Sequence, residues 1–415
     1  MAEHRTVEKN YKIRRLLINV IPAEAGIYLH MKHIPYGRQF IDKDDIKEVV
    51  KVLKSDWLTQ GPMVQKFEET LAVYCGVKYA VTVSSGTAAL HLACLAAGLK
   101  KGDEAITSPI TFLATPNAVL YTGASPVFAD IDYDTINIDP EEIKKRINGK
   151  TKAILPVHFA GLPCDMPEIA RIAERHNLIV IEDACHALGA EYKANGKWIK
   201  VGSCKHSNMT VFSFHPVKHI TTGEGGAITT NDRRIYERLK ALRTHGVYKD
   251  KKTTKKGAWY YEMRELGFNY RLTDFQCALG LSQFKKLNRF IKRRREIVKM
   301  YEESFRGNKF FSLPEEGENV KSSWHLYAIR LKDKYKQRKK EIFYRLREKG
   351  LNVQVHYIPV YQQPYYKQSG YEKVICPNAE NFYQREISIP LHYSISTKDM
   401  NYIIDTTLSV FKRFS

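Results

Sequence analysis

The sequence predicts an α/β protein, with a large domain built on a mostly parallel sheet and a smaller C-terminal α+β domain. Three observations predict this fold: the length of 415 residues, a repeated alternation of short apolar runs with amphipathic runs, and a change of pattern near residue 290. A chain of this length can bury a large core and usually forms more than one domain. Alternating strand-like and helical runs are typical of βα units around a parallel sheet. We expect a disordered N-terminal extension over 1–30, a large domain over 31–290 and a small domain over 291–415.

The apolar runs justify the elements of the large domain in turn. The run LIVIEDA (178–184) is nearly continuous in β-branched and apolar residues, which is typical of a strand buried on both faces. PEEIKKRI (140–147) carries proline and two acids in its first turn, as a helix start does. We expect strands at 79–85, 104–109, 125–132, 151–161, 178–184, 211–216 and 226–232, and helices at 87–98, 111–123, 140–147, 166–177 and 233–246. Further on we expect one or two long helices over 272–305, strands at 324–331 and 352–358, and helices at 340–350 and within 397–413.

The composition argues against several classes of function. No apolar stretch approaches the roughly 20 residues of a membrane-spanning helix, so we expect no membrane anchor. The seven cysteines are scattered without a CxxC pair, which indicates neither a disulfide framework nor a metal site and favours the reducing cytoplasm. The formal net charge of +21 favours acidic partners. The basic segments lack the aromatic interleaving of RNA-binding sheets, so we expect no nucleic-acid partner and keep such binding as a minor alternative.

Lys218 is the most specific chemical signal in the sequence. It stands in SFHPVKHITTGEGGAITTND (213–232), between an expected strand and a glycine-rich turn, with core-like residues on both sides. Burial disfavours the ammonium form of lysine, lowers its pKa and prepares the amine for imine formation. A solvent-exposed lysine is the ordinary alternative, and the apolar neighbours argue against it.

Other residues suit a pyridoxal phosphate (PLP) site around this lysine. Such a site needs an anion that keeps the pyridine nitrogen protonated. Asp183 fits this need at the end of an apolar strand, although a helix cap is its ordinary alternative. His186 could hydrogen-bond the phenolic oxygen of the ring; its ordinary alternative is a core histidine whose hydrogen bonds are satisfied within the protein. The helix start in SSGTAAL (84–90) and the hydroxyl of Ser213 suit the phosphate, and Phe112 suits the ring face or the core.

Five segments, in this order, resemble the DegT/DnrJ/EryC1/StrS sugar aminotransferases. The segments are SSGTAALHLA, SPITFLATPNAVLYTGASPVFADID, IEDACHALGAEY, FSFHPVKHITTGEGGAITTND and GFNYRLTDFQCALGLSQ. The similarity covers nearly everything from residue 36 to the C-terminus. It implies the PLP-dependent aminotransferase fold of type I, PLP as the cofactor, and a homodimer whose active sites are shared between subunits.

The resemblance also implies a set of cofactor contacts. Lys218 is expected to carry the cofactor as a Schiff base and to shuttle the proton, and Asp183 to pair with the pyridinium nitrogen. Beside the ring we expect His186 near its hydroxyl and Phe112 stacked on its face. The expected phosphate contacts, the last of them from the neighbouring subunit, are Gly86, Thr87, Ser213 and Asn269. One branch of the family replaces the lysine with histidine and dehydrates sugars, and Lys218 argues against that branch.

Two further segments indicate the substrate. DWLTQG (56–61) and NVQVHYIPVYQQPYY (352–366) resemble stretches that contact the nucleotide-sugar, with an ordinary strand as the alternative for QVHY. The expected substrate residues are Tyr36, Asp56, Trp57, Leu58, Thr59, Gln354, Val355, His356 and Tyr357, together with Gly86, Ser213 and Asn269. The expected reaction moves an amino group from L-glutamate to the 4-keto group of a UDP-linked 2-acetamido-2,6-dideoxy-hexos-4-ulose, without a metal. The alternatives are amination of another dTDP-, GDP- or UDP-linked 4-keto sugar, a PLP-dependent sugar dehydratase, and a non-catalytic PLP-bound regulator.

Overall fold

The computed structural model describes residues 33–249, 253 and 255–414. The expected N-terminal extension over 1–30 and part of the basic loop 249–256 lie outside these residues. In the part of the chain that is described, none of the helices combines the length and hydropathy that crossing a membrane requires.

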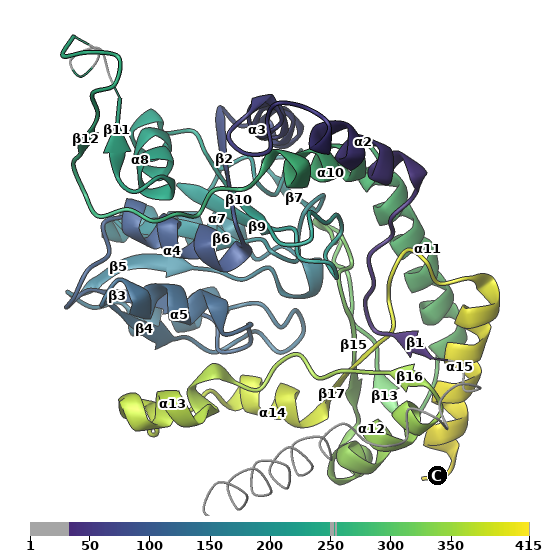
Figure 1. The fold of residues 1–415 in the computed structure, drawn as a ribbon. Helices are drawn as coiled ribbons and strands as arrows, with labels where there is room; N and C mark the ends of the chain where they lie inside the picture. Colours follow the sequence, from purple (N-terminus) through teal and green to yellow (C-terminus); the bar gives the residue numbers. More distant parts are fainter. Residues whose placement is uncertain (1–32, 250–252, 254, 415) are drawn as a thin grey trace, which may run out of the picture.

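A seven-stranded sheet forms the centre of the large N-terminal part (Figure 1). In spatial order its strands are β2 (Tyr79–Val83), β10 (Gly226–Thr230), β9 (Met209–Ser213), β6 (Ile179–Asp183), β5 (Thr151–Leu155), β3 (Glu104–Thr107) and β4 (Ser125–Phe128). Strand β10 runs antiparallel to both of its neighbours, and every other pair in the sheet is parallel. The prediction of a mostly parallel sheet is therefore confirmed.

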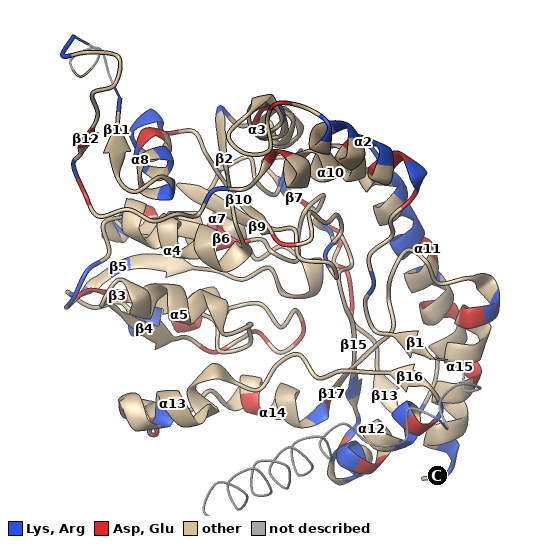
Figure 2. Ribbon diagram, in the orientation of Figure 1, with Lys and Arg blue, Asp and Glu red and all other residues tan. Residues whose placement is uncertain are grey.

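Helices cover both faces of this sheet because successive strand residues point to opposite sides. In β6, for example, Val180 packs into one hydrophobic cluster and Ile181 into the other. One face carries α4 (Gly86–Ala96), α5 (Ala114–Tyr121) and α8 (Arg233–Arg243). The other carries α3 (Pro62–Cys75), α6 (Pro140–Arg146), α7 (Met166–His176) and α10 (Asp274–Phe284), with α2 (Lys43–Leu53) packed on α10. Figure 2 shows that charged residues concentrate on outer helices such as α2 and α8, whereas the central strands are largely uncharged.

Prolines follow three of the strands that end earlier than the sequence pattern predicts. Strand β3 ends at Thr107, β5 at Leu155 and β9 at Ser213. Prolines follow these ends at positions 109, 156 and 216, and proline has no N–H group for the ladder. The chain turns away at these points, which leaves short loops along the carboxyl edge of the sheet.

A smaller antiparallel sheet organises the C-terminal part. Its strands are β13 (Phe311–Ser312), β15 (Tyr327–Leu331) and β17 (Glu386–Ile389), and the helices around it are α11 (Leu287–Phe305), α12 (Lys339–Glu348) and α15 (Thr397–Lys412). The start of α11, with Leu287 and Phe290, packs into a cluster under the large sheet, whereas Ile297 and Tyr301 pack with the small sheet. The boundary predicted near residue 290 falls within this helix and stays a prediction.

Short pairs and helices complete the fold. The strand pairs are β1 (Ile34–Pro35) with β16 (Leu351–Asn352), the hairpin β7 (Glu191–Ala194)–β8 (Lys197–Lys200) with β14 (Val320–Lys321), and the hairpin β11 (Val247–Tyr248)–β12 (Glu262–Met263). The helices are α13 (Pro364–Tyr366) and α14 (Pro377–Arg385). Short 3-10 or π turns lie at Phe159–Gly161, Asp333–Arg338, Val360–Gln362 and Lys367–Tyr371. The expected strand over 352–358 is wrong beyond Asn352. The chain there runs as a loop with a bridge from Gln354 to Ser388, because the N–H of His356 bonds to the Glu386 carboxylate instead of a strand carbonyl.

Candidate active site

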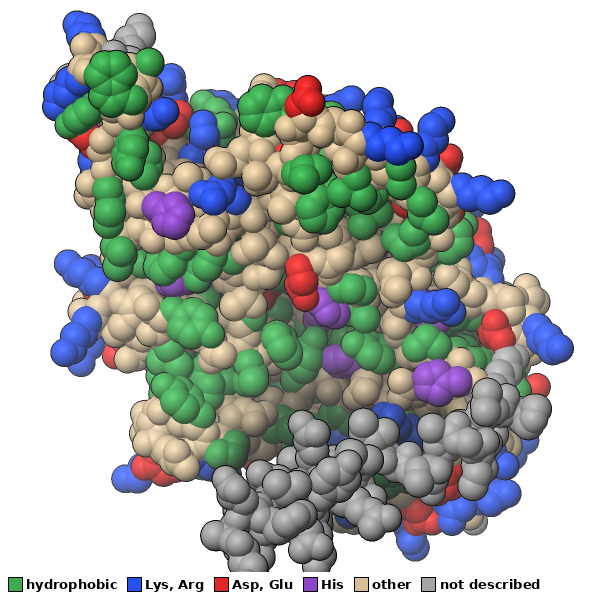
Figure 3. Space-filling model, in the orientation of Figure 1, with side chains coloured by type: hydrophobic (Ala, Val, Ile, Leu, Met, Phe, Trp, Pro, Cys, Tyr) green, Lys and Arg blue, Asp and Glu red, His purple; other side chains and the backbone are tan. Residues whose placement is uncertain are grey.

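A cavity of about 580 Å³ lies at the carboxyl edge of the large sheet. Residues that follow β2, β3, β5, β6 and β9 line it, as expected for a parallel sheet, whose strand ends meet at one edge. The segment 354–357 and His325 close it from the C-terminal part. In Figure 3, hydrophobic and histidine side chains gather in the middle of the face, between the large sheet and the C-terminal elements.

Lys218 extends into this cavity from the turn after β9. Its backbone N–H donates to the carbonyl of His215 at 2.9 Å, which tightens the turn. Burial lowers the pKa of Lys218, while Cys185 and Asp183 oppose this shift and the positive charge of Arg294 adds to it. The net direction favours the neutral amine that an imine-forming lysine needs.

Asp183 faces Lys218 from the end of β6 and is held by two donors. Its Oδ2 accepts a hydrogen bond from Thr115 Oγ1 at 2.5 Å, and its Oδ1 accepts from the backbone N–H of Cys185 at 3.1 Å. Thr115 lies in α5 and is hydrogen-bonded to Thr111 at 3.0 Å. These contacts fix the direction of the buried carboxyl group, which suits a partner for a protonated ring nitrogen.

Two histidines and a tyrosine form the other wall. The rings of His186 and His325 are 4.3 Å apart between centroids, and Nε2 of His186 lies 3.3 Å from the Tyr357 hydroxyl. Burial, strengthened by the charge of Lys218, holds the pKa of His186 well below its ordinary value, so the ring is neutral. Nε2 of His325 lies 3.5 Å from Nζ of Lys218.

The buried Nδ1 atoms of His186 and His325 have no hydrogen-bond partner among the described residues. Buried polar atoms are normally satisfied, so unpaired ones beside a cavity fit a bound polar group. A phenolic oxygen such as that of PLP meets this need beside His186.

The start of α4 forms an anion cradle at the end of β2. Ser85 caps the helix by accepting from Ala88 N–H at 3.0 Å, and the first N–H groups of a helix have no acceptor within it. A Cβ on Gly86 would lie 2.9 Å from Cβ of Ser213, so only glycine allows this approach. Gly86, Thr87 and Ser213 therefore lie together where a phosphate fits the helix N-terminus.

The structure brings most of the predicted site residues together. The cavity lining includes Tyr36, Gly86, Thr87, Phe112, Asp183, His186, Ser213, Lys218, Gln354, Val355, His356 and Tyr357. The predicted residues outside it are Asp56, Trp57, Leu58, Thr59 and Asn269. Thr59 bridges to Thr273 and Asn269 to Thr244, and the side chains of Trp57 and Leu58 are exposed.

Among the residues that sequence reasoning missed, Thr115 and His325 contact the predicted carboxylate and lysine through their side chains. Thr115 is an ordinary helix residue in the sequence, and His325 belongs to a segment read as a strand. They reach the site from positions 68 and 107 residues away from their partners Asp183 and Lys218. No spacing rule of a single strand or helix connects them.

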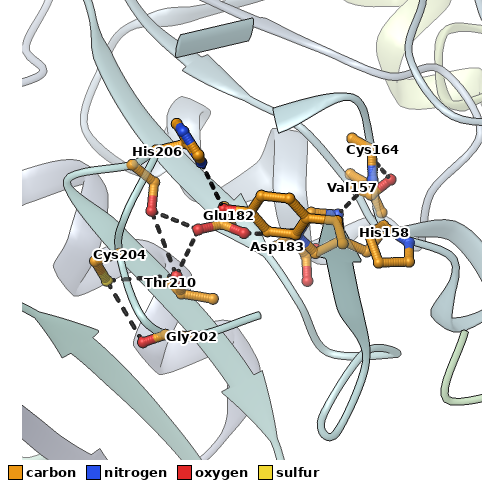
Figure 4. A network of polar contacts seen from close by, with 12 residues as sticks. Val157, His158, Cys164, Glu182, Asp183, Gly202, Cys204, His206 and Thr210 are labelled. Carbon is orange, nitrogen blue, oxygen red and sulfur yellow. Dashed lines mark hydrogen bonds and ion pairs between the residues drawn. The ribbon is translucent and has the colours of Figure 1, made fainter. Parts of the chain in front are cut away.

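A buried polar network supports Asp183 from behind (Figure 4). Glu182 points to the opposite face of β6 and accepts from His158 Nε2 and Thr210 Oγ1, both at 2.8 Å, and from the Ser207 hydroxyl. His158 Nδ1 accepts from Cys164 N–H at 3.0 Å, so its Nε2 carries the proton that it donates. Burial would raise the pKa of Glu182, but the hydrogen bonds from these donors, His158 first among them, lower it overall.

The fold and this arrangement of lysine, carboxylate and phosphate cradle define a PLP-dependent enzyme. Residues 39–408 match the DegT/DnrJ/EryC1/StrS aminotransferase family, and the chain belongs to that family. The family identifies it as an aminotransferase with the type I fold that the sequence predicts.

Three relatives add detail. The UDP-4-amino-4,6-dideoxy-N-acetyl-beta-L-altrosamine transaminase of Campylobacter jejuni is 43% identical over 383 residues, covering 92% of this chain and 98% of the relative. The Helicobacter pylori PseC structure, of an aminotransferase of pseudoaminic acid biosynthesis, has a TM-score of 0.86 at 38% identity and covers 92% of this chain and 100% of its own. The spore coat polysaccharide biosynthesis protein SpsC of Bacillus subtilis is 41% identical, covering 91% of this chain and 97% of the relative.

The same comparisons indicate the cofactor. The solved structure of NtdA from Bacillus subtilis, with a TM-score of 0.79 at 29% identity over 90% of this chain and 83% of its own, contains bound PMP. The family and such neighbours indicate pyridoxal phosphate, in agreement with the lysine, the carboxylate and the unpaired histidine nitrogen of this cavity.

Proposed function

We propose that this aminotransferase moves the amino group of L-glutamate to the 4-keto carbon of a UDP-linked 2-acetamido-2,6-dideoxy-hexos-4-ulose, giving UDP-4-amino-4,6-dideoxy-N-acetyl-β-L-altrosamine. The reaction class is supported by one observation: Lys218, Asp183 and the helix start at Gly86 line the same cavity. The substrate rests on the names of the relatives from C. jejuni and H. pylori, which match this chain over nine-tenths of its length.

Pyridoxal phosphate, when bound, would supply a carrier for the amino group between the two half-reactions and an electron sink that stabilises negative charge at the reacting carbon. Asp183, held by Thr115 and Cys185, keeps the ring nitrogen protonated. Gly86, Thr87 and Ser213 would bind the phosphate, His186 would hydrogen-bond the ring hydroxyl, and Phe112 would pack on the ring face.

Lys218 moves the proton in both half-reactions. Its Nζ would move the proton from the α-carbon of glutamate to the cofactor carbon, and one water would supply the keto oxygen of the 2-oxoglutarate that leaves while the amino group stays behind. In the second half-reaction the same Nζ delivers a proton to C4 of the sugar. A lowered lysine pKa makes the neutral amine available as a base at neutral pH.

A panel of nucleotide sugars tests the substrate. The purified protein is given glutamate with UDP-, dTDP- and GDP-linked 4-keto-6-deoxy sugars, and products are identified by NMR. The UDP-linked 2-acetamido sugar is expected to have the highest kcat/KM. The second candidate is another nucleotide-linked 4-keto sugar, since the chain is also similar to a protein of a different polysaccharide pathway, the spore coat protein SpsC. A higher kcat/KM for one of these sugars overturns the UDP-sugar assignment.

We also propose that the site is shared between two subunits of a homodimer. Asn269 and residues 56–59 would then contribute to the active site of the neighbouring subunit. Two observations support this. The cationic side chains that line the cavity are Lys218 and histidines, without an arginine among the described lining residues, although a pyrophosphate substrate favours arginine or lysine contacts. Trp57 and Leu58 are adjacent in the chain and exposed by 58% and 48%, and contiguous exposed apolar side chains are a feature of interfaces.

Mixing two inactive variants tests the sharing. Lys218→Ala and Asn269→Ala are each expected to be inactive as homodimers. After subunit exchange, a mixed dimer contains one site with both defects and one intact site, so about a quarter of wild-type activity returns at random mixing. No recovery of activity in a sample shown by mass spectrometry to contain mixed dimers overturns the shared site.

The cytoplasm remains the proposed compartment, supported by the seven free thiols.

A further inference from the structure

A buried pair of polar residues lies behind the substrate segment 354–357. Glu386 and Ser388 stand two residues apart on β17, so their side chains point to the same side of the strand, and both are fully buried. Gln354 and Ser388 exchange backbone hydrogen bonds of 3.1 and 2.8 Å, which brings His356 over the pair. His356 lines the cavity, whereas Glu386 and Ser388 lie behind it.

The hydrogen bonds of this group determine where the protons lie. Glu386 accepts from the His356 backbone N–H at 2.8 Å and from the Ser388 hydroxyl at 2.5 Å. Nδ1 of His356 lies 2.9 Å from the Ser388 oxygen. A serine hydroxyl has one proton, and a carboxylate can only accept it. Ser388 therefore accepts from His356, and Nδ1 carries the ring proton.

The charge states agree with this pattern. Burial raises the pKa of Glu386 to about 7, and the positive charge of Lys339 and the two hydrogen bonds act in the opposite direction. Glu386 is thus a carboxylate at pH 8. Burial, with the charge of Lys218, lowers the pKa of His356 to about 3, so its ring is neutral. A neutral imidazole protonated on Nδ1 presents Nε2 as an acceptor, and among the described residues the side-chain hydrogen bond of His356 is the one from Nδ1.

We propose that Glu386 and Ser388 hold His356 in the Nδ1–H tautomer, so that its Nε2 accepts a hydrogen bond from a hydroxyl or amide N–H on the same side of the sugar ring system as the keto carbon, either the 3-hydroxyl or the 2-acetamido N–H. The identity of that sugar rests on the proposed function, but the tautomer does not. Glu386 and Ser388 are positioning residues, since they act through His356. The arrangement selects for a donor at this place on the substrate and against an acceptor.

Nitrogen NMR of the wild-type protein with ¹⁵N-labelled histidine, at pH 8 and without substrate, tests the tautomer directly. The His356 signals, assigned by their loss in His356→Gln, are expected to show a protonated Nδ1 and an unprotonated Nε2. In Glu386→Gln an amide NH₂ can face Ser388, whose hydroxyl then turns to Nδ1 and shifts the ring proton to Nε2. Glu348→Gln, an exposed carboxylate on α12, is the matched control and keeps the wild-type pattern. A wild-type ring protonated on Nε2 overturns the proposal, and this result needs no variant to fold.

Half-reaction kinetics test the consequence for the substrate. Glu386→Gln and Ser388→Ala are expected to lower kcat/KM for the keto-sugar by about 10- to 100-fold, which corresponds to losing one well-placed hydrogen bond. The glutamate half-reaction is expected to lose less, because glutamate has neither the hydroxyl nor the amide N–H of the sugar, and its carboxylates cannot donate to an acceptor nitrogen. Equal losses in both half-reactions overturn the selectivity. Two sugar analogues, one without the 3-hydroxyl and one without the 2-acetamido N–H, identify the donor. The analogue that lacks the true donor is expected to be turned over equally by wild type and Glu386→Gln. If the tautomer is as expected but no UDP-sugar is aminated, the proposed function fails and the tautomer assignment stands.

Discussion

Replacing Glu182 with glutamine is expected to lower the free energy of unfolding by about 3 kcal/mol at pH 7. The carboxylate is buried and accepts hydrogen bonds from His158, Ser207 and Thr210. The glutamine oxygen can keep the two hydroxyl donors, which share one carboxylate oxygen. The amide NH₂ then faces Nε2–H of His158, which cannot change tautomer because its Nδ1 accepts from Cys164.

The loss is expected to depend on pH in a definite direction. The pKa of Glu182 is lower in the folded protein than its ordinary value of 4.5. A carboxylate with a depressed folded-state pKa stabilises the protein above its unfolded pKa, and this stabilisation is lost as pH falls through the folded pKa. The difference between wild type and Glu182→Gln is therefore full at pH 7 and shrinks below about pH 4.5.

Urea unfolding followed by tryptophan fluorescence, at several pH values, measures this difference through the transition midpoint and slope. Glu372→Gln, with an exposed carboxylate, is the control and is expected to match wild type within about 0.5 kcal/mol. A Glu182→Gln protein as stable as wild type at pH 7 would refute the reasoning. So would a difference that persists unchanged in acid.

Three further changes probe the cofactor site. Lys218→Ala is expected to lower turnover by about 10³-fold or more and to remove the visible absorbance of lysine-bound cofactor. Both are measured by spectroscopy, and a variant that keeps either one contradicts the assignment. Asp183→Asn is expected to slow turnover by about 10²-fold or more while the cofactor stays bound, and near-normal activity would mean that another residue protonates the ring. Thr115→Val removes the 2.5 Å hydrogen bond to Asp183 and is expected to slow turnover about tenfold, with cofactor content measured by absorbance unchanged; wild-type turnover would show that Cys185 N–H alone orients the carboxylate.

The central features were predictable because they are local in the sequence. The continuous apolar run before Asp183 predicts a buried strand that ends at the site, and the apolar neighbours of Lys218 predict its burial. The hairpin β7–β8 also carries a local signal, since Asn195–Gly196 between its strands is a common turn pair, and both residues have positive φ. This hairpin was absent from the expected elements although the signal was available.

The remaining features depend on contacts between distant residues. His325 reaches Lys218 only because β15 and α11 carry it there, and Glu386 replaces a strand partner for His356. In the sequence the run 352–358 has the alternation of a strand, but a buried side-chain carboxylate competes for its N–H group. Side-chain acceptors of this kind can be recognised only once two elements are placed beside each other.

Helix α11 has a mechanical consequence for substrate entry. Its 19 residues form one continuous helix about 28 Å long. One end is anchored under the large sheet and the other beside the small one. Midway along it, the buried Arg294 donates to the carbonyls of Trp324, His325 and Leu391. Swinging the C-terminal part as a block would bend this helix and break those bonds, so the wall of the cavity that His325 forms stays in place relative to the large sheet when a substrate enters.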